Sequence, residues 1–92
     1  MAAYEQILTE LIQIHQEYGF KPYYRDGEIH TGQCTTSQME RLDAEGWKCT
    51  STSGTYSRPA SSSSENIDRG EFGRLEHGGH KFRVTDGCIV MR

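Results

Sequence analysis

The clearest pattern along the chain is an apolar stripe near the N-terminus that recurs every three or four residues. It consists of Tyr4, Ile7, Leu8, Leu11, Ile12, His15 and Tyr18, with Glu5, Glu10, Gln13 and Glu17 between its members. This spacing predicts an amphipathic helix. Gly19 is the residue type that ends a helix in the left-handed conformation, so we expect the helix to stop there and Phe20 to fold back onto its last turn.

Between Phe20 and Thr31 the pattern changes to that of a β-hairpin. Asp26-Gly27 suits the two positive-φ positions of a type I′ turn, and such a turn fixes the register of both strands. The cross-strand pairs in this register are Arg25–Glu28, Tyr24–Ile29 and Tyr23–His30. Pro22 cannot donate a hydrogen bond to a ladder, so we expect this strand at an edge of the sheet.

A capping box predicts a second, short helix. In Ser37-Gln38-Met39-Glu40, Ser37 would cap the free amides while the Glu40 side chain reaches back to the cap. We expect this helix to end at Gly46 and to place Trp47 against Leu42.

The segment from Trp47 to Arg58 is predicted as a second hairpin about Ser53-Gly54, although most of its side chains are polar. Tyr18-Gly19-Phe20-Lys21 and Glu45-Gly46-Trp47-Lys48 each join a helix to a strand through a glycine and an aromatic residue. Two interpretations stay open. The chain contains a degenerate helix-hairpin repeat, or the similarity is only the common way in which helices end.

Residues 57–66 contain Pro59 and a run of serines, and Ala60 is their one apolar side chain. Such a segment cannot repay the entropy lost on ordering, so we expect a mobile Ser-rich loop over 57–66. Beyond it, strands at 71–76, 80–85 and 88–92 predict a meander turned at His77-Gly78-Gly79 and at Asp86-Gly87.

The second turn of the meander sets which side chains share a face. The apolar cross-strand pairs in its register are Val84–Ile89 and Phe82–Met91. We expect the first helix to pack on this apolar face, with Arg83 and Val90 on the opposite face.

These elements predict an α+β fold. Two helices would pack on one face of an antiparallel β-sheet that is built from hairpins and a C-terminal three-stranded meander. The chain has 92 residues, of which 34% are hydrophobic. This length suits a single domain over residues 1–92 with one small core and little room for a deep active site.

Composition and charge bear on location and partners. We find no apolar run long enough for a membrane span, no signal peptide, and three widely spaced cysteines, which together favour a cytoplasmic protein with reduced thiols. Residues 1–46 carry three basic and eight acidic side chains, whereas 47–92 carry seven basic and five acidic ones. The acidic half suits a basic partner. The weakly basic second half gives little support for nucleic-acid binding.

Histidines and cysteines offer candidate ligands or catalytic groups without a supporting spacing. The candidate zinc ligands lack the tight pairs of structural zinc sites, and they are His30, Cys34, Cys49, His77, His80 and Cys88. Paired glycines are poor support for catalytic histidines. We therefore expect no cofactor, no metal and no enzymatic activity. Gly46-Trp47-Lys48 with Ser53-Gly54-Thr55-Tyr56 resembles the helix-strand core of HicA-type toxin nucleases, but Thr55 stands where the histidine is expected.

Two binding surfaces are predicted instead. The first would use aromatic anchors with an acidic rim to hold another protein that has a basic surface. Its residues are Tyr18, Tyr23, Tyr24, Asp26, Glu28, Glu45 and Trp47. The alternative surface would bind nucleic acid through the C-terminal meander. The residues of this nucleic-acid-binding surface are Arg74, His80, Lys81 and Arg83. A further alternative is a small metal-binding or nuclease-like domain.

The first surface is the one that the sequence favours. Small size and missing catalytic motifs suit a stoichiometric inhibitor from a phage or mobile element, such as an anti-CRISPR-like or other anti-defence protein, or a toxin-neutralising partner. We also expect that the chain could form a homodimer through an uncovered sheet edge, with the final strand as the candidate edge.

Overall fold

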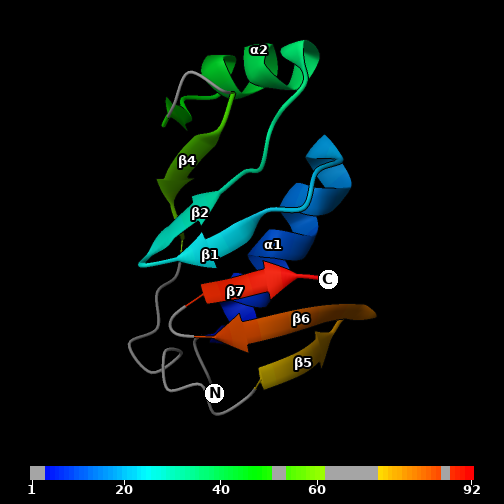
Figure 1. Ribbon diagram of the computed structural model, residues 1–92. Helices are drawn as coiled ribbons and strands as arrows, with labels where there is room; N and C mark the ends of the chain where they lie inside the picture. The colour runs from blue at the N-terminus through cyan, green and yellow to red at the C-terminus, as the bar shows by residue number, and fades with distance from the viewer. Residues whose placement is uncertain (1–3, 51–53, 62–72, 86–87) are drawn as a thin grey trace.

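The computed structural model describes residues 4–50, 54–61, 73–85 and 88–92. Within these residues, two helices and seven strands follow one another. Figure 1 shows how they are arranged. Their bounds are α1 Tyr4–Tyr18, β1 Tyr23–Arg25, β2 Glu28–His30, α2 Thr36–Ala44, β3 Lys48–Cys49, β4 Tyr56–Pro59, β5 Gly73–His77, β6 His80–Thr85 and β7 Cys88–Met91. All strands join one sheet in the order β3-β4-β2-β1-β7-β6-β5, and each pairing is antiparallel.

Helix α1 has the bounds that the apolar stripe predicts. Gly19 follows it at φ 92°, its amide bonds to the His15 carbonyl at 2.9 Å, and the Phe20 ring stacks on the Tyr18 ring at 5.4 Å. The predicted stop and fold-back are therefore confirmed. The stripe itself needs one addition, because Ile14 is only 5% exposed and belongs to the core.

The first hairpin has the predicted turn and register. Asp26 and Gly27 both take positive φ, and β1 pairs with β2 in the three cross-strand pairs that the turn predicts. The predicted edge position of this strand is wrong, because β7 pairs along the other side of β1. Pro22 causes no conflict since it precedes the first ladder residue, Tyr23, and needs to donate no ladder hydrogen bond.

Helix α2 is short, as expected, but its capping box lies two residues earlier than predicted. Thr35 is the N-cap, its hydroxyl accepts from the Gln38 amide, and the Gln38 side chain accepts from the Thr35 amide. Gly46 ends the helix at φ 89°, and the Trp47 amide bonds to the Leu42 carbonyl at 3.0 Å. Trp47 and Leu42 also share the core, as predicted.

The second hairpin is formed by β3 and β4, in which Lys48 pairs with Ser57 and Cys49 with Tyr56. Residues 51–53 of its turn lie outside the described residues. The predicted loop over 57–66 begins too early, because Ser57 is 4% exposed and pairs with both β3 and β2. Its polar side chain did not prevent strand formation, since the backbone finds ladder partners on both sides. Residues 62–66 are not among those described.

The C-terminal meander has the predicted apolar face. β6 pairs with β7 through Phe82–Met91 and Val84–Ile89, and all four side chains are buried. The first turn is tighter than expected, because β5 extends to His77 and only Gly78-Gly79 forms the turn. The predicted turn at Asp86-Gly87 and the start of the first strand at 71–72 lie outside the described ranges.

The final strand is not an edge of the sheet, contrary to expectation. β7 lies between β1 and β6, so the strands at the two ends of the sheet order are β3 and β5. The prediction assumed that the last strand in the sequence is also the last strand in the sheet. Instead, β7 pairs with β1, which lies near the start of the chain. A homodimer through the final strand is therefore ruled out by its neighbours on both sides.

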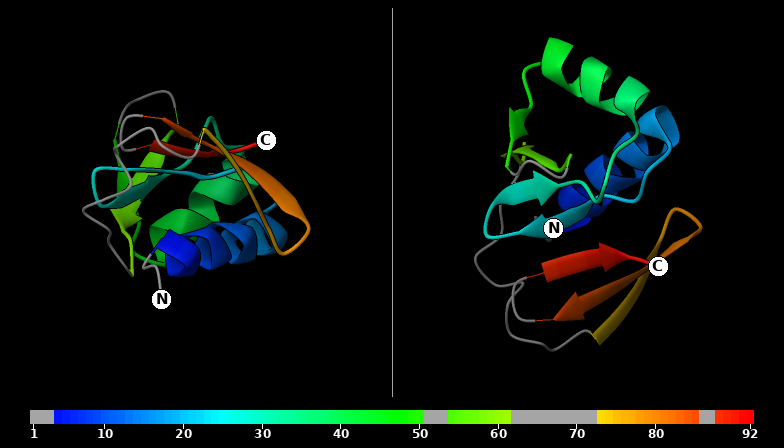
Figure 2. Two further views of the ribbon diagram at one scale, coloured as in Figure 1. Left: turned by 90° about the horizontal axis from the view of Figure 1, so that it is seen from below. Right: turned by 45° about the horizontal axis from the view of Figure 1, so that its top comes forward.

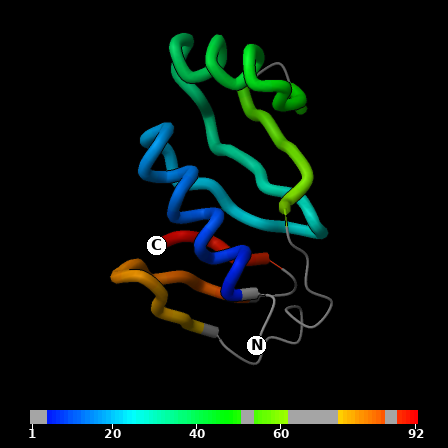
Figure 3. The backbone as a smooth tube through the Cα atoms, turned by 180° about the vertical axis from the view of Figure 1, so that it is seen from behind, coloured from blue at the N-terminus to red at the C-terminus, as the bar shows by residue number. Residues whose placement is uncertain are grey.

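Both helices lie on the same side of the sheet, as predicted for this α+β fold (Figure 2, left). Seen from behind, α1 crosses β1, β7 and β6, while α2 lies beside the β3–β4 end (Figure 3). The core between the layers includes Ile7, Leu11, Trp47 and Phe82. Neither helix in the described part of the chain has the length and apolar character that a membrane span needs.

The element order helix-hairpin occurs twice, as α1–β1–β2 and α2–β3–β4. The two hairpins lie side by side, because β2 pairs with β4. An internal duplication of the sequence stays a hypothesis.

Candidate nucleic-acid interface

The residues predicted to bind a protein partner do not form one surface. Tyr24 and Trp47 are 3% and 7% exposed and belong to the core, so neither can anchor a partner. Asp26 and Glu28 are exposed on the β1–β2 hairpin, next to the half-buried Tyr23. Two of the four predicted aromatic anchors are thus buried in the core and cannot contact a partner.

Tyr18 and Glu45, which were predicted to bind a protein partner, instead contact each other and link α1 to the end of α2. The Tyr18 hydroxyl donates a hydrogen bond to Glu45, and the Arg41 guanidinium lies over the Tyr18 ring at 4.3 Å. Arg41 also forms ion pairs with Glu45 at 3.2 Å and with Glu17 at 3.3 Å. One cation therefore compensates much of the acidic rim that was expected to attract a basic partner.

Most residues of the predicted nucleic-acid-binding set lie on one surface. Arg74, Lys81 and Arg83 are exposed, and they alternate along β5 and β6 with residues that face the core. They lie on the sheet face away from the helices, which we call the outer face. His80 points to the other side, where its ring meets the His15 ring edge-on at 6.0 Å. The structure therefore brings three of the four residues together.

The outer face is strongly basic among the residues that the structure describes. Its charged side chains follow from strand register and alternating burial. The cations are Arg25, Lys48, Arg74, Lys81, Arg83 and Arg92, and the acids are Glu28 and Glu76. The helices and the α2 C-cap carry the opposite sign, with Arg41 the one Lys or Arg among them. Their acids are Glu5, Glu10, Glu17, Glu40, Asp43 and Glu45.

Flat rings and an apolar side chain lie between the cations. Tyr23 is directly opposite Val90 of β7 on one side and opposite His30 of β2 on the other. The Tyr23 and His30 rings stack at 5.1 Å with 15° between their planes. Val90 is 45% exposed, and it is the one large hydrophobic residue exposed in the described part of the chain. Cations around rings and an apolar spot form a surface that can hold nucleotides.

The surroundings of His30 disfavour its charged form. Its side chain is 13% exposed, and burial together with the nearby Arg25 guanidinium lowers the pKa of His30 below its ordinary value of 6.5. Glu28, at 3.7 Å, and Asp26 oppose this lowering. A neutral imidazole can stack on an aromatic ring or a base without a desolvated charge.

A hollow of about 850 Å³ lies beside the β5–β6 hairpin. Arg74, Lys81 and Arg92 line it together with His80, and Glu76 is the one acidic lining residue. No ion pair joins these three cations to a described residue. They are therefore available to an anion such as a phosphate group.

The histidines and cysteines considered as metal ligands are dispersed. Among the described residues, no group of three or more His, Cys, Asp or Glu side chains could hold a metal ion. Cys34 is buried with its thiol 3.4 Å from the Thr31 hydroxyl, and His77 lies 3.0 Å from the Thr9 hydroxyl. His30 is on the outer face, so these residues do not share one place in the fold.

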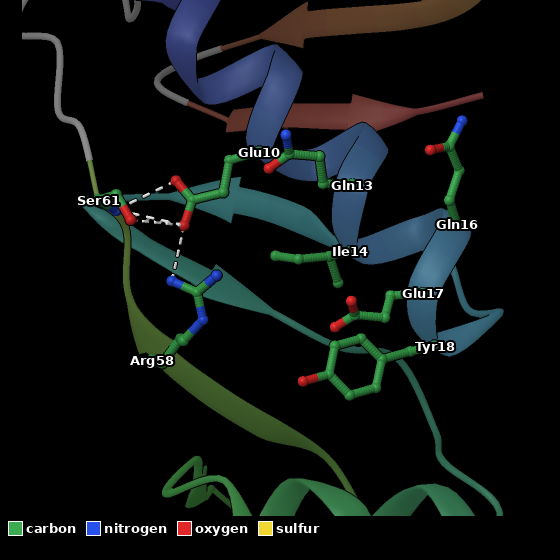
Figure 4. Close-up of a pocket in the computed structure, with 8 residues that line it drawn as sticks. All are labelled: Glu10, Gln13, Ile14, Gln16, Glu17, Tyr18, Arg58 and Ser61. Carbon is green, nitrogen blue, oxygen red and sulfur yellow. Dashed lines mark hydrogen bonds and ion pairs between the residues drawn. The ribbon is translucent and has the colours of Figure 1, made fainter.

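A second cavity, of about 580 Å³, lies between α1 and β4 (Figure 4). Its buried carboxylate, Glu10, forms an ion pair with Arg58 at 2.7 Å and accepts hydrogen bonds from the amide and hydroxyl of Ser61. These groups satisfy one another and tie the end of β4 to α1. The cavity thus has a structural explanation, and the outer face is the better candidate site.

Comparison of the chain with models of known protein families, with curated proteins and with solved structures finds no match. Function is therefore inferred from the geometry of the outer face. Sequence reasoning missed Arg25, Lys48, His30 and Val90 as members of one surface with the C-terminal cations. The predicted registers of the separate hairpins contain part of this signal, but the pairing of β1 with β7 does not follow from them.

Proposed function

We propose that the protein is a non-enzymatic binding module that holds a single-stranded nucleic acid on the outer face of its sheet. The observation that carries this proposal is one row of directly paired residues across all seven strands. The row runs Arg74, Arg83, Val90, Tyr23, His30, Ser57 and Lys48. We call it the central row. Cations occupy both of its ends, and two rings with an apolar side chain occupy its middle.

Each part of the central row suits a part of a nucleotide. Guanidinium and ammonium groups attract phosphate oxygens, and a half-buried ring such as that of Tyr23 can stack on the flat face of an unpaired base. Bases in a duplex are stacked on one another and cannot reach the Tyr23 ring. The surface therefore favours a single strand, whereas a duplex would offer it phosphates alone.

A partner that offered only negative charge would use less of this surface. Acidic peptides could engage Arg74 and Arg83, but they would bring no flat group to stack on the Tyr23–His30 ring pair. The protein-binding role expected from the sequence, including an anti-defence inhibitor, stays a prediction. The cluster of Tyr18, Arg41 and Glu45 is satisfied internally and adds no observation in its favour.

The test measures fluorescence anisotropy of a labelled thymidine oligomer of about 12 nucleotides, a length within the range of about 4 to 16 that small single-strand-binding folds cover. We expect a micromolar dissociation constant at low salt, with weaker binding to a matched duplex. Tyr23→Leu should weaken binding at least about fivefold, because a base loses its stacking partner, while Tyr23→Phe keeps the ring and the affinity.

Tyr18→Leu is the matched control, because Tyr18 lies on the helix side of the molecule, and it should leave the affinity unchanged. Polyglutamate serves as a competitor that has charge without bases and should displace the oligomer poorly. The proposal is wrong if single strands do not bind at low salt, or if Tyr23→Leu and Tyr18→Leu behave alike. Efficient displacement by polyglutamate would show that the face responds to charge only, which also contradicts base stacking.

A further inference from the structure

The outer face is divided into three rows that run across the sheet, and the central row differs from its neighbours in charge. One flanking row contains Cys88, Arg25, Glu28 and Pro59, and the other contains Glu76, Lys81 and Arg92. Each flanking row therefore includes one carboxylate. The central row has none, so a polyanion that follows it meets the least repulsion.

The shape of the face also favours this direction. Seven strands at a spacing of about 4.8 Å make the central row about 29 Å long. Along the strand direction β1 and β2 each have only three residues, which is about 10 Å at about 3.3 Å per residue. A nucleic acid that ran parallel to the strands would leave the central hairpin after a short distance.

Both ends of the central row carry cations that lack an anion in the described part of the chain. Arg74 lies directly opposite Arg83, a pairing of like charges that costs stability unless an anion lies between them. At the other end, Lys48 is exposed on the short edge strand β3. Phosphates at the two ends, with bases over Tyr23 in between, would use the cations and the rings of the row.

We infer, on the basis of the proposed function, that a bound strand crosses the sheet at right angles to the β-strands and reaches from the Arg74–Arg83 pair to Lys48. The ligand is thus a single strand long enough to span the central row. A short oligomer engages one end and the rings only. Lys48 contributes to affinity only when the oligomer reaches it.

The experiment compares labelled thymidine oligomers of about 3, 6 and 12 nucleotides on the wild type and on Lys48→Ala and Lys48→Arg. Wild-type affinity should rise steeply once an oligomer spans the row. Lys48→Ala should weaken binding of the longest oligomer about three- to tenfold, leave the shortest unchanged, and reduce the salt slope of the longest by about 0.7. Lys48→Arg keeps the charge and should match the wild type.

Arg83→Gln provides the contrast, because Arg83 lies toward the other end of the row and Val90 alone separates it from Tyr23. This substitution should weaken the binding of oligomers of every length. The inference is overturned if Lys48→Ala weakens all lengths equally or none, while the longest oligomer still binds the wild type. That result would leave the proposed function standing with a different path of the strand. Absence of binding by every oligomer would instead remove the proposed function together with this inference.

Discussion

The His30 ring stacks on the Tyr23 ring with 5.1 Å between centroids, at the middle of a sheet face that is otherwise basic. Both residues belong to one hairpin whose turn, Asp26-Gly27, fixes them opposite each other. A local turn signal thus places two rings side by side on the surface that we propose as the binding site. A change of pH can alter the charge of this ring pair, because His30 can be protonated.

The pH dependence follows from the lowered pKa of His30. In the free protein His30 should titrate below 6.5, because burial and Arg25 disfavour its charged form. A bound phosphate strand favours the imidazolium, so binding should raise this pKa and affinity should increase as pH falls through it. The measurement is an NMR titration of the His30 ring with and without a thymidine oligomer. An unchanged or lower pKa in the complex would contradict a strand at this position.

The same shift affects stability in the opposite direction. Between the folded-state pKa and 6.5, the unfolded chain binds the proton more readily, so the free energy of unfolding should decrease as pH falls through this window. His30→Gln cannot titrate and should remove this component. Urea unfolding of both proteins at several pH values between about 7.5 and 5 measures it. Parallel pH profiles for the two proteins would show that His30 is not responsible.

Arg74 offers a test that separates stability from function. Because Arg74 and Arg83 lie directly opposite each other, Arg74→Glu replaces a like-charge pair by an opposite-charge pair. We expect an increase of about 0.5 kcal/mol in the free energy of unfolding together with weaker binding of a thymidine oligomer. Urea unfolding and anisotropy on the same preparations give both numbers. A variant that is less stable and binds normally would refute the functional role of this pair.

The ion pair between Glu10 and Arg58 should matter for the fold alone. Glu10 is 9% exposed, so Arg58→Ala leaves a largely buried carboxylate without its cation and should lower the free energy of unfolding by about 2 to 3 kcal/mol. The comparison is Arg41→Ala, whose ion pairs are solvent-exposed and worth about 0 to 1 kcal/mol. Equal losses in the two variants by urea unfolding would disprove a special role of the buried pair.

The start of α2 can be located by a pair of alanine substitutions. Thr35→Ala removes the hydroxyl that accepts from the Gln38 amide and should cost about 1 kcal/mol of stability. Ser37 is exposed within the helix, and Ser37→Ala should change stability by less than about 0.5 kcal/mol. Thermal or urea unfolding decides between them. A larger loss for Ser37→Ala would restore the sequence-based assignment of the cap.

Local chemistry accounts for what could be predicted from the sequence. The glycine after α1, the Asp26-Gly27 turn and the alternation around Phe82 and Val84 each act over a few residues, and the structure has all of them. The capping box was misplaced because two overlapping motifs, starting at Thr35 and at Ser37, both satisfy the pattern, and only backbone geometry distinguishes them.

The basic face could not be predicted because it depends on pairings between distant segments. β1 pairs with β7 and β2 pairs with β4, and these ladders put Lys48, Arg25 and Arg83 on one side of a single sheet. In the linear sequence, the C-terminal cations alternate with acids, and this pattern predicts that their charges cancel. Of those acids, Glu76 lies on the outer face, while Glu65, Asp68, Glu71 and Asp86 lie outside the described residues.

The most direct test of the outer face as the binding surface is NMR chemical-shift mapping of isotope-labelled protein titrated with an unlabelled thymidine oligomer. We expect the amide signals of Tyr23, His30, Arg83 and Val90 to shift in a saturable way, while those of α2 stay in place. Shifts confined to α1 and α2, or no shifts at low salt, would contradict the account.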